Sequence, residues 1–257
     1  ILSSVAFLAL MWVAFFWAQK YFPMEQDSAA VAKVEEKKVA YLTFDDGPSK
    51  HTQEVLDILD TYHVKATFFV TGSNPEYYDL IKKADAKGHA IGIHTFSHDY
   101  GKIYSSEEAY FEDVNKTNAL IEKQTGHKVN ILRFPGGTSN TVSRKYSSGI
   151  MSTLAASVTQ KGYEYYDWNA SNGDGNCYVG SDSLINTALK EIRDKKEVMI
   201  LMHDGTGNKA TVEALPTILK SMLSQGYEFR VIDSSTRYFI IISQTEKVWY
   251  NISYAVA

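Results

Sequence analysis

The sequence contains a single cysteine, Cys177, so no disulfide can form within the chain. It also lacks an excess of positive charge: the formal net charge is −4, and nothing in the composition indicates a nucleic-acid partner. A glycine-rich phosphate-binding loop is missing after the first predicted strand, where the segment FDDGPS holds only one glycine. These absences argue against proteins held by internal disulfides, nucleic-acid-binding proteins and nucleotide-binding proteins.

The sequence does have an uncharged apolar run at its start. Residues 1–18, ILSSVAFLALMWVAFFWA, are about as long as a helix that crosses a bilayer. We expect this N-terminal hydrophobic helix to be an uncleaved membrane anchor, with a secretory signal segment as the alternative. Residues 19–37 are polar and are predicted to be a linker. The rest of the protein is then expected outside the cytoplasm, at a bacterial cell envelope.

From residue 38 onward, short apolar segments alternate with segments of helical periodicity. Short strands that are apolar on both faces are typical of parallel sheets covered by helices. The sequence therefore predicts an α/β fold with about seven parallel strands, either an open doubly wound sheet or a (β/α) barrel. The predicted strands are 39–44, 66–70, 90–94, 129–134, 163–167, 198–202 and 227–232.

The helical segments have recognisable starts and ends. A capping box from Ser105 to Glu108 predicts the start of a long helix, and Gly126 predicts its end. The last predicted strand ends at residue 232, and one domain is expected over residues 38–236. Residues 237–257 do not follow the pattern and are predicted to be a C-terminal tail.

Chemically reactive side chains follow five of the predicted strands. The carboxyl ends of parallel strands share one face of a sheet or barrel, and active sites of such barrels lie on that face. Five separate clusters are therefore expected to meet in space. They are Asp45-Asp46, His94–His98 (HTFSH), Arg133–Gly137 (RFPGG), Asp167–Asn169 (DWN) and His203-Asp204.

The HTFSH cluster predicts a metal site. If the segment forms a helical turn, His94 and His98 lie on one side and can bind the same ion. A carboxylate from Asp45 or Asp46 would complete a site of two histidines and one carboxylate, with open positions for water and substrate. The other aspartate would face the water, and the cation would offset the repulsion between the two carboxylates. The alternative is a turn in which one aspartate caps the following helix.

The remaining clusters indicate proton transfer and charge stabilisation. His203 suits proton transfer because its unperturbed pKa lies near neutrality, and Asp167 is the candidate carboxylate that favours its charged form. Arg133 can hold one of the aspartates by a bidentate contact. Gly136 and Gly137 leave backbone N–H groups unobstructed, as an oxyanion site requires.

The motifs FDDGP, HTFSH, RFPGG, DWN and LMHD, in this order and spacing, resemble those of carbohydrate esterase family 4. These are the polysaccharide deacetylases that share the NodB-type homology domain. The resemblance covers about residues 38–236 and implies a distorted (β/α) barrel. It also implies metal-dependent removal of N-acetyl groups from a sugar polymer, with one divalent ion, in most cases Zn²⁺, and Co²⁺ or Ni²⁺ as alternatives.

The resemblance assigns roles to the residues at the first three motifs. Asp46, His94 and His98 would be the metal ligands. Asp45 would be the general base that takes a proton from the attacking water, and Arg133 would position this base.

The substrate expected is N-acetylglucosamine of peptidoglycan, and no protein partner is predicted. The alternatives are a chitin-oligomer or acetylxylan deacetylase, a non-catalytic carbohydrate-binding relative, and a metal phosphoesterase on a similar barrel.

The resemblance also assigns roles around the reacting carbonyl. The backbone N–H of Gly136 would contact the oxyanion. His203 would be the general acid, with Asp167 tuning it, while Trp168 and Leu201 would shape the pocket for the acetyl methyl group. This chain departs from the family pattern at Gly136, where many relatives carry an aromatic residue. One wall of the subsite is therefore expected to be open, with a changed substrate preference.

Overall fold

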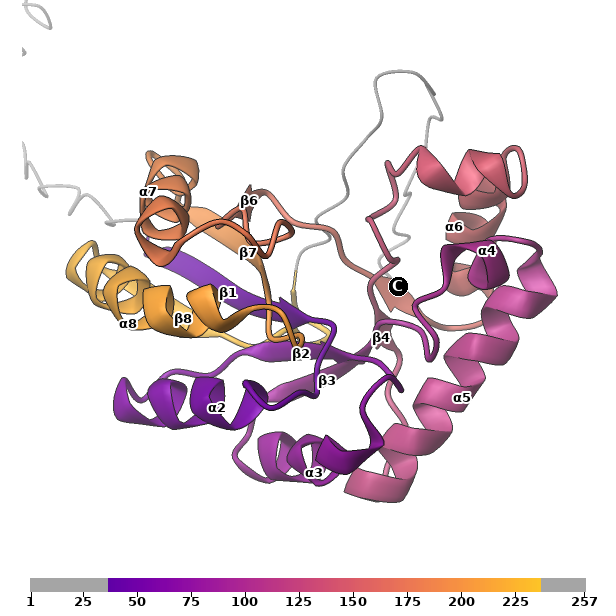
Figure 1. The fold of residues 1–257 in the computed structure, drawn as a ribbon, viewed down its shortest axis with the longest axis horizontal. Helices are drawn as coiled ribbons and strands as arrows, with labels where there is room; N and C mark the ends of the chain where they lie inside the picture. The colour runs from indigo at the N-terminus through magenta and orange to yellow at the C-terminus, as the bar shows by residue number, and fades with distance from the viewer. Residues whose placement is uncertain (1–36, 237–257) are drawn as a thin grey trace, which may run out of the picture. The chain divides into compact units, whose positions relative to one another are not determined.

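A sheet of eight parallel strands organises residues 37–236, the part of the chain that the computed structural model describes (Figure 1). The predicted anchor, all of the predicted linker except Lys37, and the predicted tail lie outside these residues. The strands are β1 (Lys38–Asp45), β2 (Thr67–Val70), β3 (Ala90–Ile93), β4 (Ile131–Leu132), β5 (Glu164–Tyr165), β6 (Ala170–Ser171), β7 (Glu197–His203) and β8 (Tyr227–Arg230).

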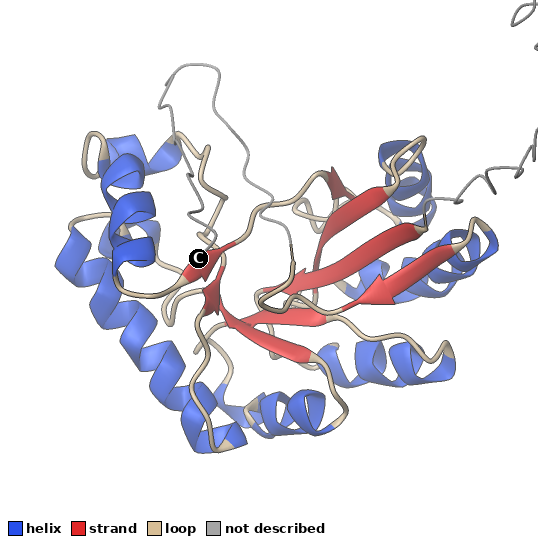
Figure 2. Ribbon diagram, turned by 180° about the vertical axis from the view of Figure 1, so that it is seen from behind, coloured by secondary structure: helices blue, strands red, loops and turns tan. Residues whose placement is uncertain are grey.

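Helices connect the strands and cover the outer side of the sheet (Figure 2). No helix within residues 37–236 is long and apolar enough to cross a bilayer. The α-helices are α2 (Thr52–Thr61), α3 (Asp79–Ala86), α4 (Tyr100–Ile103), α5 (Glu107–Thr125), α6 (Ile150–Gln160), α7 (Ser181–Glu191) and α8 (Lys209–Ser224). Two 3₁₀ helices, η1 (Pro75–Tyr77) and η2 (Val142–Lys145), complete the set.

Strand β1 is an interior strand of the sheet, which curls into a distorted barrel. It pairs with β7 along one edge, and its other edge is shared by β8 at the start of the strand and β2 at the end. The spatial order β5-β4-β3-β2-β1-β7-β6 contains no pairing of β5 with β6 within the described residues, so the barrel stays open there. All seven predicted strands are present, and the predicted α/β barrel is confirmed. The extra strand, β6, has only two residues and was not predicted.

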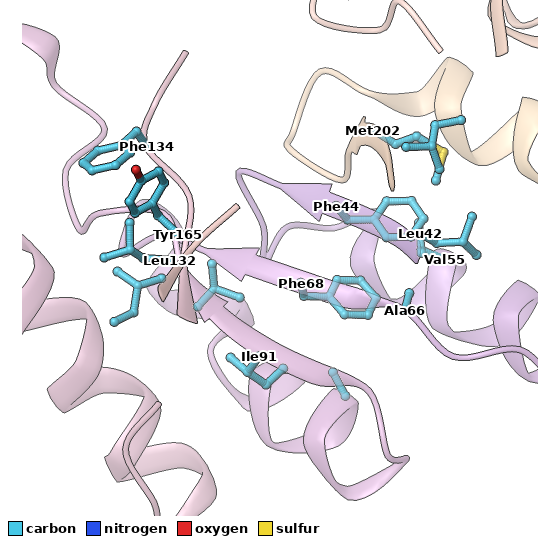
Figure 3. Close-up of a cluster of buried hydrophobic side chains, with 14 of the residues drawn as sticks. Leu42, Phe44, Val55, Ala66, Phe68, Ile91, Leu132, Phe134, Tyr165 and Met202 are labelled. Carbon is cyan, nitrogen blue, oxygen red and sulfur yellow. The ribbon is translucent and has the colours of Figure 1, made fainter. Parts of the chain in front are cut away.

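Alternate residues of the strands enter two different cores, as the two-residue period of a strand requires. Leu42 and Phe44 of β1 point outward and pack with Val55 of α2 and Phe68 of β2 (Figure 3). The Phe44 and Phe68 rings stack at 5.3 Å between centroids. A smaller inner core fills the barrel, and its buried members are Tyr41, Phe69, Ile131, Tyr166, Met199 and Ile232.

The same alternation determines which residues face the barrel interior at the carboxyl end of the sheet. Thr43 and Asp45 follow Tyr41 on the inner face of β1, and Leu201 and His203 follow Met199 on the inner face of β7. The register pairs Asp45 with His203 across the two strands. The sheet therefore brings a carboxylate and an imidazole together at the mouth of the barrel.

The start of α5 differs from the predicted capping box by one residue. Ser106, not Ser105, is the N-cap, and its hydroxyl accepts a hydrogen bond from the backbone N–H of Ala109 at 3.2 Å. Gly126 ends the helix as predicted, in the left-handed conformation with φ 87°. This helix packs behind β3 and the segment that follows it, which matters for the site described below.

Candidate active site

The two aspartates at the end of β1 point in different directions because the backbone changes conformation between them. Asp45 still belongs to the strand, and its side chain is buried on the inner face. Asp46 has φ 71°, the left-handed conformation, which is uncommon outside glycine and is typical of functional turns. Its carboxylate is about one-third exposed. The chain thus presents one carboxylate to the interior and one to the mouth of the barrel.

The turn that follows Asp46 packs against a second buried carboxyl group, that of Asp204. A Cβ atom on Gly47 would lie 2.4 Å from both Asp204 carboxylate oxygens, so only glycine fits there. The Thr52 hydroxyl donates a hydrogen bond of 2.5 Å to Asp204, and burial raises the pKa of Asp204 to about 7. The turn that carries Asp46 is therefore held in place by the packing of Gly47 against Asp204.

The HTFSH segment is an irregular loop and not the helical turn that the spacing suggested. Thr95 and His98 have positive φ values of 66° and 49°. The Asp113 carboxylate of α5 accepts hydrogen bonds from the backbone N–H groups of Phe96 and Ser97, at 2.5 and 2.7 Å. Although burial alone would raise the pKa of Asp113, these hydrogen bonds and Lys102 outweigh it and lower the pKa. The charged Asp113 carboxylate of α5 thus holds the backbone of the HTFSH loop in place.

This loop brings His94 and His98 to Asp46. One ligand atom from each of the three residues lies within 4.8 Å of the other two. The Nε2 atoms of His94 and His98 lie 3.6 and 3.4 Å from Asp46 Oδ1. The three residues that the sequence nominated as ligands are therefore adjacent in space.

The protonation pattern of these residues fits a cation between them. The Nδ1 atom of His94 lies 2.9 Å from the Arg133 carbonyl oxygen, to which it can only donate, so its Nε2 lone pair faces Asp46. Burial lowers the pKa of His94 to about 3, so its imidazole is neutral. Asp46 Oδ1 has no hydrogen-bond partner within the described residues. A lone pair facing a carboxylate oxygen is unfavourable alone, and a divalent cation bound by both removes the conflict.

Arg133 holds Asp45 from inside the barrel. Its guanidinium is fully buried and donates from Nη1 to Asp45 Oδ1 at 2.9 Å and to the Thr43 hydroxyl at 2.7 Å. The contact with Asp45 is a single hydrogen bond and not the predicted bidentate pair, because Nε and Nη2 donate to the carbonyl oxygens of Tyr166 and Asp167. Burial raises the pKa of Asp45, and Arg133 offsets only part of that effect. Asp45 is thus an oriented carboxylate whose proton affinity is above normal.

His203 is paired with Asp174, and the prediction that Asp167 tunes it is wrong. His203 Nδ1 lies 2.7 Å from Asp174 Oδ1, and the His203 backbone N–H donates to Asp174 Oδ2 at 2.8 Å. The Asp167 carboxylate is turned toward Thr138, accepting hydrogen bonds from its backbone N–H at 3.0 Å and from its hydroxyl. The backbone carbonyls of Tyr166 and Asp167, just after β5, accept hydrogen bonds from Arg133. Asp174, in the loop after β6, contacts His203 at the end of β7.

The environment of His203 favours its charged form. Burial alone would lower the pKa of this imidazole, but the hydrogen bond and charge of Asp174, together with Asp45 and Asp46, outweigh burial and raise the pKa to about 9. The side chain remains partly exposed, at 17%. His203 is therefore a protonated group at neutral pH that can reach a substrate.

The remaining predicted residues surround this centre. Gly136 and Gly137 both have φ 76°, and Gly137 donates its backbone N–H to the Phe134 carbonyl at 2.8 Å, whereas Gly136 makes no such bond within the described residues. A Cβ on Gly137 would lie 2.9 Å from the Trp168 ring, so Trp168 covers this loop. Leu201 is buried two residues before His203, on the same inner face of β7.

The structure therefore places the ligand atoms of Asp46, His94 and His98 together and Asp45 beside Arg133 and His203, whereas the Asp167 carboxylate bonds to Thr138. Sequence reasoning missed Asp174, Asp113 and Tyr100, whose ring packs against the His98 ring at 5.6 Å between centroids. Asp174 lies in the loop after β6, a strand that was not predicted, and Asp113 lies within a helix, so neither follows a predicted strand end. Only Tyr100 had a usable signal, because it follows HTFSH by two residues.

Known proteins have sequences and structures similar to those of this chain. Residues 32–151 match the family model described as polysaccharide deacetylase. A peptidoglycan-N-acetylglucosamine deacetylase of Bacillus cereus is 33% identical over 211 residues, which are 79% of this chain and 72% of that protein. A peptidoglycan-N-acetylglucosamine deacetylase of Listeria monocytogenes is 32% identical over 220 residues, 84% of this chain and 42% of that protein.

Two solved structures are similar over almost all of the described residues. The catalytic domain of a peptidoglycan N-acetylglucosamine deacetylase from Eubacterium rectale is 40% identical with a TM-score of 0.78, covering 80% of this chain and 93% of that one. A polysaccharide deacetylase from Bacillus cereus is 32% identical with a TM-score of 0.68, covering 79% of this chain and 96% of that one. From its motifs, its fold and these likenesses, the chain belongs to the polysaccharide deacetylase family, the hydrolytic deacetylases of carbohydrate esterase family 4.

Proposed function

We propose that this chain is a metal-dependent N-deacetylase that acts on N-acetylglucosamine residues of peptidoglycan. The observation that carries the proposal is that Asp46, His94 and His98 meet at one point, with Asp45 and His203 paired beside them across β1 and β7. The names of the similar proteins from Bacillus, Listeria and Eubacterium support peptidoglycan as the substrate. Since peptidoglycan lies outside the membrane, the proposal also places the enzyme outside the cytoplasm.

Asp46, His94 and His98 would hold one divalent ion. Two imidazole nitrogens and one carboxylate oxygen, with further positions open, suit Zn²⁺, and Co²⁺ or Ni²⁺ can take the same ligands. When bound, the ion would polarise the acetamido carbonyl and make water a stronger nucleophile near neutral pH. The carbonyl of Arg133 would keep His94 in the tautomer that binds a metal.

The chain's own residues would supply the proton transfers. Asp45, oriented by Arg133, would accept a proton from the attacking water, and its raised pKa makes it a better base at neutral pH. The Gly136 N–H, which has no partner within the described residues, would donate to the oxygen on which charge develops. His203, charged through Asp174, would give its proton to the departing amine. Trp168 and Leu201 would enclose the acetyl methyl group.

The test measures acetate release from purified peptidoglycan, chitin oligomers and acetylxylan, and phosphate release from aryl phosphates, in parallel. We expect acetate from peptidoglycan, its loss after treatment with a chelator, and its recovery when Zn²⁺ or Co²⁺ is added back. A variant His98→Gln should bind Co²⁺ at least ~10-fold more weakly and lose acetate release with it, because one of three ligands is removed.

Preference for chitin oligomers would keep N-deacetylation and change the substrate, whereas preference for acetylxylan would make the enzyme an O-deacetylase. Chelator-insensitive acetate release would contradict the metal dependence. Binding of acetylated glycan without any acetate release would instead indicate a carbohydrate-binding relative, and phosphate release would indicate a phosphoesterase.

A further inference from the structure

Tyr100 joins the two loops that form the proposed site. It is the first residue of α4 and follows the ligand His98 by two residues. Its ring packs edge-on against the rings of His98 and Tyr104, with centroids 5.6 and 5.4 Å away. The Tyr104 hydroxyl in turn donates a hydrogen bond of 2.7 Å to the carbonyl of Pro135, next to Gly136. The short helix α4 is therefore fixed between the metal loop and the RFPGG loop.

The Tyr100 hydroxyl occupies the space that a side chain at position 136 would need. A Cβ on Gly136 would lie 2.6 Å from the Tyr100 oxygen and 3.1 Å from the Asn140 Cβ. The first distance is shorter than any normal contact of a Cβ atom. Gly136 also has φ 76°, which favours glycine. The wall that the sequence suggested to be open at Gly136 is thus closed by a residue from another motif.

Two hydrogen-bond donors lie at this wall, and no acceptor for either is found among residues 37–236. Neither the Tyr100 hydroxyl nor the Gly136 backbone N–H donates to any of residues 37–236. Tyr100 is only partly exposed, so its hydroxyl is held by the packing of its ring. A buried or half-buried donor of this kind gains most when a ligand oxygen accepts from it.

We propose that Tyr100 contacts the substrate: its ring forms one wall of the acetamido subsite, and its hydroxyl donates a hydrogen bond to the acetamido oxygen beside the Gly136 N–H. This proposal rests on the deacetylase function proposed above and adds a substrate-contacting residue to it. A donor directed at the oxygen on which charge develops stabilises the transition state more than the bound substrate.

The test compares the wild type with Tyr100→Phe, which keeps the ring and removes the hydroxyl. We expect kcat for acetate release to fall about 100-fold while KM changes less than about 3-fold, as for the loss of one oxyanion donor. Acetate binding to the Co²⁺-loaded protein, followed through its visible spectrum, should weaken about 10-fold, whereas Co²⁺ affinity and Tm stay the same. The matched control is Tyr62→Phe, since Tyr62 ends α2 at the opposite end of the strands.

Unchanged kcat and acetate affinity in Tyr100→Phe would overturn the proposal, provided that the wild type releases acetate. A parallel loss of Co²⁺ affinity would also overturn it, because Tyr100 would then act through His98 and not on the substrate. If the wild type releases no acetate from any glycan, the proposed function fails and the substrate contact fails with it. These three outcomes are distinguishable in one set of measurements.

A double-mutant cycle tests the steric part separately. Gly136→Ala should crowd the Tyr100 hydroxyl and strain the left-handed backbone, whereas in a Tyr100→Phe background the crowding by the hydroxyl is removed and the strain and the contact with Asn140 remain. We therefore expect Gly136→Ala to lower Tm less in the Tyr100→Phe protein than in the wild type. Equal losses in both backgrounds would show that the hydroxyl does not occupy the space beside Gly136.

Discussion

Asp174 offers the sharpest test of the charge arrangement, because one substitution removes the charge while keeping the size and shape of the side chain. Its Oδ1 atom pairs with His203 Nδ1 at 2.7 Å, and its Oδ2 atom accepts from the His203 backbone N–H and from the Thr211 hydroxyl, at 2.8 and 2.6 Å. Asp174→Asn keeps the shape and removes the negative charge. It also puts an amide donor where one of the carboxylate oxygens accepts hydrogen bonds.

The expected size of the effect follows from the pKa of His203. This pKa is raised from 6.5 to about 9, a difference that is equivalent to about 3 kcal/mol in favour of the protonated imidazole. Without Asp174, burial of the ring, which lowers the pKa, is opposed mainly by the smaller effects of Asp45 and Asp46. We therefore expect the pKa of His203 to fall by at least about 2 units, to near or below its usual value.

The assay is the pH profile of kcat/KM for acetate release. Because the general acid must be protonated, the alkaline limb of the profile should move from near pH 9 in the wild type to near pH 7 or lower in Asp174→Asn. Stability gives a second readout on the metal-free protein. A raised folded-state pKa stabilises the wild type fully below pH 6.5, and this contribution is lost as the pH rises through about 9.

The variant should therefore lose the decline in unfolding free energy between pH 6.5 and 9, and Asp182→Asn, on the exposed surface of α7, should keep it. An alkaline limb that stays at the same pH in Asp174→Asn would refute this reasoning. It would mean that a group other than His203 controls the alkaline limb.

Three further substitutions test other parts of the site. Arg133→Met should lower the unfolding free energy by about 3–5 kcal/mol in urea denaturation, because it leaves the buried Asp45 carboxylate unpaired; a loss below 1 kcal/mol would contradict this. Asp113→Asn should weaken Zn²⁺ binding in calorimetry by about 10- to 100-fold, since the loop between His94 and His98 loses its charged anchor, and the exposed neighbour change Glu112→Gln should not. Ser106→Ala should cost about 1 kcal/mol of stability through the lost N-cap and leave kcat unchanged, and a drop in kcat would mean that α5 transmits to the site.

The residues that sequence reasoning located well are those attached to strands. Asp45 and His203 end strands whose apolar alternation is visible in the sequence, and the parallel register then places them opposite each other. The HTFSH pair also lies where a strand end predicts it. For these residues, both the position along the chain and the direction of the side chain follow from the two-residue period of a strand.

The errors occurred where a loop determines the position of a side chain. The choice of Asp167 as the partner of His203 assumed that a carboxylate at a strand end points into the site, but its side chain bonds to Thr138 and its carbonyl to Arg133. Likewise, the grouping of His94 and His98 assumed a helical turn. Thr95 and His98 instead have left-handed backbones, and the Asp113 carboxylate accepts hydrogen bonds from the backbone N–H groups of Phe96 and Ser97 between them. Such long-range contacts have no periodic signature in the sequence.

The dual role of Arg133 has a consequence for how the site tolerates motion. Its main-chain carbonyl receives the hydrogen bond from His94, and its side chain donates to Asp45. The distance between the proposed ligand His94 and the proposed base Asp45 thus depends on the conformation of one amino acid, Arg133. Arg133 follows β4, whereas Asp45 ends β1 and His94 follows β3, so a single residue links groups from three strands. A displacement of Arg133 would therefore disturb both groups together.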